Sequence, residues 1–561
     1  MKNCEKSFFD NKKMADLKIV YGSSADDTLK NAALNLSRYA GKAFDCDISC
    51  IPASDIHEEP HNIIFVGKTD FDTARVKDAC KGLYNCGIAI VADGDNLYLT
   101  GENETGAMYA VYTFLEDFVG WRFYSSKFET LVPDAAKDLP QDACITYSPK
   151  LFNRDTFWFD SFDVEFASKL KLNGGVTRSR KGYGALVKYA GPFVHTLPGL
   201  AGTPRVPDVQ PCLTDPEVYE KVLGNVRNLL KENPDAKIIS VSQNDSHDFG
   251  LGCQCDKCKA IDEREGTPMG SLLTFVNRIA DDIKDDYPDV FVDTLAYRYT
   301  RKAPKSIRPR DNVIIRLCSI ECCFSHTLDS DCPRNVAFRK DIEDWAKISK
   351  NLFIWDYTTD FLFYVIPFPN LKVLYDNVRF FVDHNVIGLF EQGNGQSQSG
   401  EFGELRAYML AKVMWDPDMP REKFEELVDD FLKGYYGPGW KYVKEYIDKV
   451  CALSGETHMG IYDFVQNNLS IENKDEASVI EELEGLWKKA LEASDELHYE
   501  NVEKSSLQIY YTKLLRLWHK DTSPMELKDM YSKLKKYNIT HFREGVKLPV
   551  EPDFNKPLAE W

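Results

Sequence analysis

The sequence predicts an α/β protein built around a (β/α)8 TIM barrel, with a small α/β domain before the barrel and a helical domain after it. The barrel prediction depends on residues 147–412, where short apolar runs alternate with helical stretches. Eight βα units over roughly 250 residues match the size of a TIM barrel. The candidate strands begin near Leu151, Leu170, Phe193, Lys237, Phe291, Asn312, Leu352 and Val386.

The segment before the barrel has the pattern of a compact α/β unit. Residues 1–14 are predicted to be a polar tail, and residues 15–146 the small domain. Apolar residues at helical spacing between 29 and 39 predict an amphipathic helix. The turn Asp93-Gly94-Asp95-Asn96 lies between two apolar runs, which predicts a hairpin.

The segment after the barrel, residues 413–561, is predicted to be helical. Phe424, Leu427, Val428, Phe431 and Leu432 repeat at helical spacing, and Gly437-Pro438-Gly439 ends that helix. Residues 481–497 and 502–518 show the same pattern. We expect these helices to pack on the flank of the barrel.

The composition excludes several classes of partner. The chain has 561 residues, 43% of them hydrophobic, and a formal net charge of -19. Because such a charge repels phosphate backbones, we expect no nucleic-acid partner. No apolar stretch approaches the roughly 20 residues of a membrane span. The N-terminus shows no signal peptide, so we expect a cytoplasmic protein, or a secreted one if the native chain begins upstream. The oligomeric state is left open.

Four of the central apolar runs end in a carboxylate. Asp245, Glu321, Asp356 and Glu391 follow the fourth, sixth, seventh and eighth candidate strands. A buried carboxylate is costly unless it is paired, and TIM barrels keep their chemistry at the carboxyl ends of their strands. Glycoside hydrolysis uses such acids to protonate the leaving oxygen and to stabilise the transition state. The alternative for Asp245 and Glu321 is a helix cap or an ion pair with Arg316, and the alternative for Glu391 is a plain polar loop.

Polar and aromatic residues at the same strand ends suit a sugar. Aromatic rings combined with hydroxyl-binding polar groups indicate a substrate groove, although any single ring is more simply explained as core. Histidine at such a position is more often structural than catalytic. The candidate substrate-binding residues are Arg154, Asn173, His195, Asn244, Tyr297, Trp355, Asp356, Tyr357 and Gln392.

The cysteines supply a second signal. Cys253, Cys255 and Cys258 form a C-x-C-x-x-C motif with His247 nearby, which predicts a possible structural zinc site. The alternative is a reduced, thiol-rich loop. No other cofactor is expected, because the sequence has no glycine-rich phosphate loop, no H-E-x-x-H and no G-x-S-x-G.

Several of these motifs resemble a bacterial family first defined as a domain of unknown function, part of which is glycoside hydrolase family 163. The similar segments are Val241-Ser242-Gln243-Asn244-Asp245, the cysteine motif, Asp293-Thr294-Leu295-Ala296-Tyr297, Arg316-Leu317-Cys318-Ser319-Ile320-Glu321-Cys322 and Trp355-Asp356-Tyr357-Thr358-Thr359. Residues 106–116 and 120–122 are similar to the small domain that precedes the barrel in several glycosidase families.

This resemblance covers roughly residues 60 to 440 and implies an endo-β-N-acetylglucosaminidase with a retaining, substrate-assisted mechanism. It implies Glu321 as general acid/base and Asp245 as the residue that orients the substrate acetamide, with Glu391 as a rival for either role. The expected partner is an oligosaccharide or glycan. A non-catalytic carbohydrate-binding barrel, another exo-acting glycosidase and a metal-dependent hydrolase remain alternatives.

Overall fold

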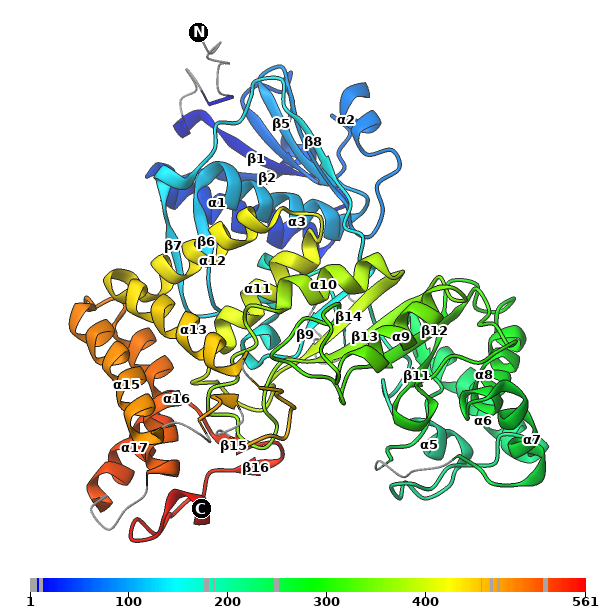
Figure 1. The fold of residues 1–561 in the computed structure, drawn as a ribbon. Helices are drawn as coiled ribbons and strands as arrows, with labels where there is room; N and C mark the ends of the chain where they lie inside the picture. The colour runs from blue at the N-terminus through cyan, green and yellow to red at the C-terminus, as the bar shows by residue number, and fades with distance from the viewer. Residues whose placement is uncertain are drawn as a thin grey trace.

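The computed structural model describes residues 8–9, 14–175, 181–184, 187–246, 252–455, 457–464, 468–471, 475–517 and 523–561. Most of the predicted polar tail, and His247, lie outside these residues. Figure 1 shows an N-terminal α/β part at the top, a curled sheet towards the right and C-terminal helices at the left. Within the described residues, no helix is both long and apolar enough to cross a bilayer.

The N-terminal part is a mixed six-stranded sheet in the order β2-β1-β3-β5-β4-β8. β1, β2, β3 and β5 pair in parallel, and β4 runs antiparallel to both β5 and β8. The helices α1 and α3 pack together against one face, and α2 covers the other. The bounds are β1 (Lys18–Tyr21), α1 (Asp27–Phe44), β2 (Ser49–Pro52), β3 (Ile63–Val66), α2 (Ala74–Ala79), β4 (Ile88–Asp93), β5 (Asn96–Gly101), α3 (Glu104–Phe114) and β8 (Cys144–Tyr147).

The local sequence explains these elements. Helix α1 begins where the Asp26 carboxylate accepts the N–H of Leu29, and it ends at Asp45 in the left-handed region. Its buried residues include Leu29, Leu36 and Tyr39, so the predicted amphipathic helix is confirmed. The predicted hairpin at residues 93–96 is also confirmed, since β4 and β5 pair antiparallel across it. A small hairpin, β6 (Trp121–Phe123) and β7 (Glu129–Leu131), follows α3.

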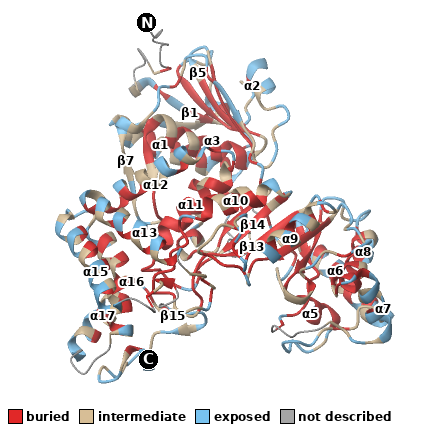
Figure 2. Cartoon of the chain, in the orientation of Figure 1, coloured by how far each residue is buried: buried red, intermediate tan, exposed pale blue. Residues whose placement is uncertain are grey.

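The central part is a curled, fully parallel sheet in the order β10-β11-β12-β13-β14-β9. Helices cover its outer side, and Figure 2 shows β13 and β14 as buried. The bounds are β9 (Asn153–Thr156), α4 (Val164–Lys169), α5 (Leu197–Ala201), α6 (Pro216–Glu232), β10 (Ile238–Ser240), α7 (Asp256–Glu265), α8 (Met269–Ile283), β11 (Phe291–Ala296), β12 (Val313–Cys318), α9 (Val336–Ala346), β13 (Leu352–Tyr357), α10 (Leu374–Asp383), β14 (Val386–Gln392) and α11 (Gly403–Trp415).

Short backbone contacts continue the curl between its two edges. The N–H groups of Asn173 and Gly174 bond to Arg154 of β9, Gly174 pairs with Val187, and Tyr189 pairs with Ile238 of β10. The sheet is therefore consistent with a TIM-like barrel. The strands predicted near Leu170 and Phe193 are misplaced, because Leu170 ends helix α4 and the pairing residues are Asn173, Gly174, Val187 and Tyr189.

The inward side of the curled sheet combines an apolar layer with a buried ion pair. Val187, Ile238, Ile314 and Phe353 form one buried cluster. Two residues beyond Ile314 on the same side of β12, the guanidinium of Arg316 bonds to the Asp293 carboxylate and to the Tyr189 hydroxyl. The burial of the Asp293 carboxylate is therefore explained by its ion pair with Arg316.

The C-terminal part is helical, with one hairpin that the sequence analysis missed. Ser523 and Glu526 form a capping box at the start of α17. The short strands β15 and β16 pair antiparallel and return the chain to the curled sheet (Figure 1). The bounds are α12 (Arg421–Tyr436), α13 (Trp440–Ser454), α15 (Glu476–Ala493), α16 (Tyr499–Arg516), α17 (Pro524–Lys536), β15 (His541–Arg543) and β16 (Val546–Lys547).

Candidate functional site

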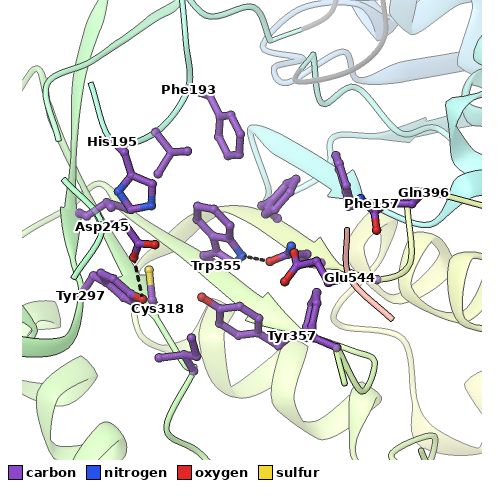
Figure 3. Close-up of a pocket in the computed structure, with 18 of the residues that line it drawn as sticks. Phe157, Phe193, His195, Asp245, Tyr297, Cys318, Trp355, Tyr357, Gln396 and Glu544 are labelled. Carbon is purple, nitrogen blue, oxygen red and sulfur yellow. Dashed lines mark hydrogen bonds between the residues drawn. The ribbon is translucent and has the colours of Figure 1, made fainter. Parts of the chain in front are cut away.

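A cavity of about 460 Å³ opens at the carboxyl ends of the curled sheet's strands (Figure 3). This volume lies within the range of about 300–1,000 Å³ that is usual for ligand sites. Among the described residues that line it, Asp245 and Glu544 supply the carboxylates. Aromatic side chains form much of the wall: Phe157, Phe193, Tyr297, Trp355, Tyr357, Phe361, Tyr364, Phe390 and Tyr462.

Asp245 lies just beyond β10 and is accessible to solvent from the cavity. Its carboxylate accepts the N–H of Ser246 at 2.9 Å and the hydroxyl of Tyr297 at 3.3 Å. The Tyr297 hydroxyl in turn accepts the Nε–H of Arg298 at 2.8 Å. This chain of donors fixes the Asp245 carboxylate against one wall of the cavity.

His195 lies beside Asp245 on the same side of the cavity (Figure 3). Its Nδ1 is 3.0 Å from the carbonyl oxygen of Gln243, so Nδ1 carries the proton and Nε2 keeps its lone pair in the neutral ring. Burial lowers the pKa of His195, which favours that neutral form. The residue adopts φ 54°, a left-handed conformation that costs a non-glycine residue energy.

Glu544 enters the cavity from the turn of the β15–β16 hairpin. Two hydrogen bonds hold the turn: the Glu544 N–H donates to Phe361 at 2.9 Å, and the Gly545 N–H donates to Gln396 Oε1 at 2.8 Å. The residue is solvent-accessible, yet the cavity walls desolvate its carboxylate. That desolvation, and then the charge of Asp245, raise the pKa of Glu544 above its ordinary value.

The sequence analysis did not identify Glu544. The sequence signal for this hairpin is a glycine, Gly545, between two short runs with strand character. In the structure Gly545 adopts φ 71°, a conformation that favours glycine in turns. That signal indicates a hairpin but says nothing of where the hairpin docks.

Aromatic rings form a continuous surface between the two carboxylates. The Trp355 and Tyr357 rings are 6.2 Å apart and nearly parallel, at 20°. Phe193 lies 5.4 Å from Trp355, and the Trp355 Nε1–H donates to Gln392 Oε1 at 2.7 Å. Tyr462 is 52% exposed at the cavity wall, so the face of its ring is open to a ligand.

Glu321 lies outside the set of lining residues, on the turn that follows β12. Its carboxylate is 39% exposed and bonds to Arg301 Nη1 at 2.8 Å. Arg301 also bonds to Asp341 at 2.7 Å. Its neighbour Ile320 does line the cavity, whereas the Glu321 carboxylate is held by its ion pair with Arg301.

Asp356 and Glu391 are brought together, but not at the cavity. They are direct partners in the β13–β14 pairing, and the residues on either side of each, including Trp355 and Gln392, are the ones that line the cavity. Because side chains alternate across a strand, these two carboxylates point to the opposite face. Burial raises the pKa of Asp356 to about 6, and burial, followed by the charge of Asp356, raises the pKa of Glu391 well above its ordinary value.

Three other predicted binding residues have structural roles. The Asn244 amide donates to Val206 and Val209 and so holds the loop before α6. Arg154 is buried, bonds to the carbonyls of Leu151 and Lys171, and lies against the ring of Trp415. The Asn173 side chain bonds to backbone groups of β9 and Phe152.

The cysteine motif gains a fourth thiol from a distant segment. The sulfur atoms of Cys212, Cys253, Cys255 and Cys258 all lie within 4.8 Å of one another, and Cys212 and Cys255 are 3.6 Å apart. The pKa of Cys255 is lowered to about 6, mainly because the Cys258 N–H donates a hydrogen bond to the Cys255 sulfur. Four thiols at this spacing could bind a structural metal, and Cys4 is a donor set typical of zinc.

Comparisons with known proteins agree with this architecture. A family GH115 4-O-methyl-α-glucuronidase with specificity for decorated arabinogalactans matches 93% of this chain and 75% of its own, with a TM-score of 0.55 and 11% identity. A β-N-acetylhexosaminidase from Bacteroides fragilis matches 74% of this chain and 90% of its own, with a TM-score of 0.42 and 14% identity. The first likeness shows that the fold resembles that of a glycoside hydrolase.

Sequence comparison identifies the family directly. No curated protein matches the chain. The model of the family described as "Domain of unknown function (DUF4838)" matches residues 123–448. Since this match spans more than half of the sequence, the chain belongs to the DUF4838 family.

Proposed function

We propose that the protein is a glycoside hydrolase that cleaves an N-acetylglucosamine-containing glycan in the cavity at the mouth of the curled sheet. The observation that carries the proposal is the pair of carboxylates, Asp245 and Glu544, that face one aromatic-lined cavity. Most glycosidases use two catalytic carboxyl groups that lie in different environments. The GH115-like fold supports a carbohydrate substrate.

Glu544 has the properties of the general acid. Its raised pKa keeps a proton on the carboxyl at higher pH than for an ordinary glutamate. A protonated carboxyl at the cavity can donate to the glycosidic oxygen as the bond breaks. This assignment differs from Glu321, the residue that the family resemblance implies, whose carboxylate is held by Arg301.

Asp245 has the properties of the partner carboxylate. The N–H of Ser246 and the hydroxyl of Tyr297 both donate to it, so the carboxylate is held in a fixed position at the cavity. A charged carboxylate can orient the N–H of a substrate acetamide, so that the acetamide oxygen attacks the anomeric carbon. The neutral His195 beside it offers Nε2 as a further acceptor.

The aromatic surface has the properties of a sugar platform. Trp355 and Tyr357 present nearly parallel rings, and Tyr462 adds an exposed ring at the wall. Sugar rings have apolar faces that pack on such surfaces, while Gln392 and Gln396 offer amides to hydroxyl groups.

The test compares two glutamine variants on labelled N-glycans and on a panel of fluorogenic glycosides. Glu544→Gln should lower the rate by about 10²–10⁴-fold, whereas Glu321→Gln should retain it. The reverse order would assign the acid to Glu321. An N-acetylglucosaminide should be cleaved and the matched glucoside should not, since it lacks the acetamide. Binding without cleavage of any substrate would indicate a non-catalytic carbohydrate-binding barrel.

A further inference from the structure

A second group of metal-binding side chains lies next to the cavity, far from the four-cysteine cluster in sequence. It consists of Cys323, His326, Cys332 and His458, one ligand atom from each lying within 4.8 Å of all the others. Both thiols are buried and reduced. No spacing in the sequence revealed this group, because His458 comes from the C-terminal part of the chain.

Two distances within the group are close to the edges of a tetrahedron around one ion. Cys323 Sγ is 3.2 Å from His326 Nδ1, and Cys332 Sγ is 3.3 Å from His458 Nδ1. Zinc bonds of about 2.3 Å to sulfur and 2.0–2.1 Å to nitrogen set the edges of a tetrahedron at about 3.3–3.8 Å. The side chains therefore stand close to the positions that a bound zinc ion requires.

The surroundings prepare His326 for metal binding. Its Nε2 lies 3.2 Å from the carbonyl oxygen of Gly455, so Nε2 carries the proton and the lone pair is on Nδ1, which faces the thiol of Cys323. Metal-binding histidines usually donate their other N–H in this way, because the bond fixes both tautomer and ring orientation.

Asn335 holds the loop that carries the first two ligands. Its side chain is fully buried, accepts the N–H of Cys323 at 2.7 Å and donates to the carbonyls of Cys323 and His326 at 3.2 Å each. Cys332 is tied to the same residue, since the Asn335 N–H donates to its carbonyl at 2.9 Å. Through its side-chain amide and its backbone N–H, Asn335 thus contacts three of the four ligand residues.

We propose that Cys323, His326, Cys332 and His458 bind a structural Zn²⁺ ion. Four protein ligands leave no open position for a substrate or an activated water, so the site is closed. Two thiolates and two imidazoles suit zinc better than the hard cations, which prefer oxygen. The proposal is independent of whether the cavity hydrolyses glycosides.

The ion would fasten together two segments that form the cavity wall. The loop from Cys323 follows Ile320, and the segment from His458 leads to Tyr462; both of these lining residues belong to the cavity. The same segments are already joined by the bond from the Phe324 N–H to Met459 at 2.8 Å, and the Phe361 N–H donates to Ile461 at 2.8 Å. Zinc would hold Tyr462 in place from outside the cavity.

The test measures zinc in a variant that lacks the other cluster. Cys253→Ser combined with Cys255→Ser leaves the second group as the candidate site, and the purified protein should contain about one zinc per chain. Adding His458→Asn, or separately Cys332→Ser, should reduce zinc to a small fraction of that value. Adding Cys451→Ser, a buried thiol outside both clusters, is the matched control and should not.

Two further measurements keep the test decisive if a variant folds poorly. X-ray absorption at the zinc edge of the Cys253→Ser/Cys255→Ser protein should show two sulfur and two nitrogen ligands. Hydrogen exchange should be faster at the Phe324 and Phe361 amides after His458→Asn. A folded Cys253→Ser/Cys255→Ser protein without zinc, or a Cys323–Cys332 disulfide in protein isolated without reductant, would overturn the proposal.

Discussion

Desolvation by the cavity walls, and then the charge of Asp245 across the cavity, raise the pKa of Glu544, although the two residues lie far apart in the sequence. Asp245 follows β10 of the curled sheet, and Glu544 lies in the last hairpin. The charge on Asp245 therefore opposes ionisation of Glu544. This relationship makes their chemistry testable by titration, independently of any substrate.

Asp245→Asn should lower the pKa of Glu544, because it removes the negative charge that opposes ionisation. A general acid is active in its protonated form, so the rate falls as pH rises through its pKa. The fall should therefore occur at lower pH in the variant than in the wild type. Carbon-13 NMR of labelled glutamate side chains measures the pKa directly. Glu321→Gln is the control and should leave it unchanged; an unchanged pKa in Asp245→Asn would contradict the coupling.

Trp355→Ala should weaken glycan binding more than it destabilises the fold. Its ring lies on the cavity surface and stacks beside Tyr357. Loss of an aromatic platform costs about 1–2 kcal/mol, or roughly 5–30-fold in affinity. Calorimetry with N-acetylglucosamine oligomers measures this loss. Trp440→Ala, a tryptophan on α13 away from the cavity, should bind normally, and equal losses in both variants would argue against the platform.

Glu391→Gln should stabilise the protein at pH 8. Within the described residues neither carboxylate oxygen of Glu391 has a hydrogen-bond partner, and the folded-state pKa is raised well above its ordinary value. At a pH between the pKa of Glu391 in the unfolded chain and its higher pKa in the folded chain, the unfolded chain has released a proton that the folded chain retains. Stability then falls as pH rises, so the stabilising effect of glutamine should grow with pH, to about 1 kcal/mol or more.

Glu401→Gln is the matched comparison for that variant. Glu401 is also buried, but it pairs with the guanidinium of Arg406, and its Oε1 accepts the Phe368 N–H at 3.1 Å. Breaking such a pair should destabilise the protein by about 3–5 kcal/mol. Thermal unfolding is measured at pH 5 and pH 8. At pH 8 the melting temperature of Glu391→Gln should lie above that of the wild type, and the melting temperature of Glu401→Gln should lie below it. A Glu391→Gln protein that melts earlier than wild type at pH 8 would refute the interpretation.

Cys255→Ser should remove any metal that the four-cysteine cluster binds and should loosen the loop before α6. That loop reaches the site, because the Asp208 N–H donates to the carbonyl of Asp245 at 3.0 Å. We expect faster proteolysis near Cys212 and a rate within about tenfold of wild type, since the cluster is not at the cavity. Cys144→Ser, an exposed thiol, is the control. A loss of several orders of magnitude would favour a metal-dependent hydrolase.

The central strands were predictable because buried parallel strands are continuous apolar runs. Ile314, Ile354 and Leu389 belong to runs that the structure shows as β12, β13 and β14. The same property hides which face each residue occupies, because both faces of such a strand are apolar. Trp355 and Tyr357 line the cavity, whereas Asp356 between them does not. Neighbouring residues of one strand therefore differ in role: one lines the cavity, and the next is buried on the other face of the sheet.

Contacts between distant segments could not be predicted from local patterns. Cys212 joins the cysteine motif, His458 joins Cys323, and Glu544 reaches the cavity only through tertiary packing. Each residue is ordinary in its own sequence neighbourhood. The weak strands before β10 were misplaced for the related reason that their pairing rests on two isolated bridges.

The hairpin that carries Glu544 also determines when the cavity can be completed during synthesis of the chain. Chains fold from the N-terminus during synthesis, so the curled sheet can form while the hairpin is still untranslated. Tyr462 and Glu544 both lie beyond residue 448, where the family match ends. A gene fragment cut at that boundary would encode the sheet with one side of its cavity open. On the ribosome, likewise, the cavity can be completed only after the β15–β16 hairpin has been synthesised.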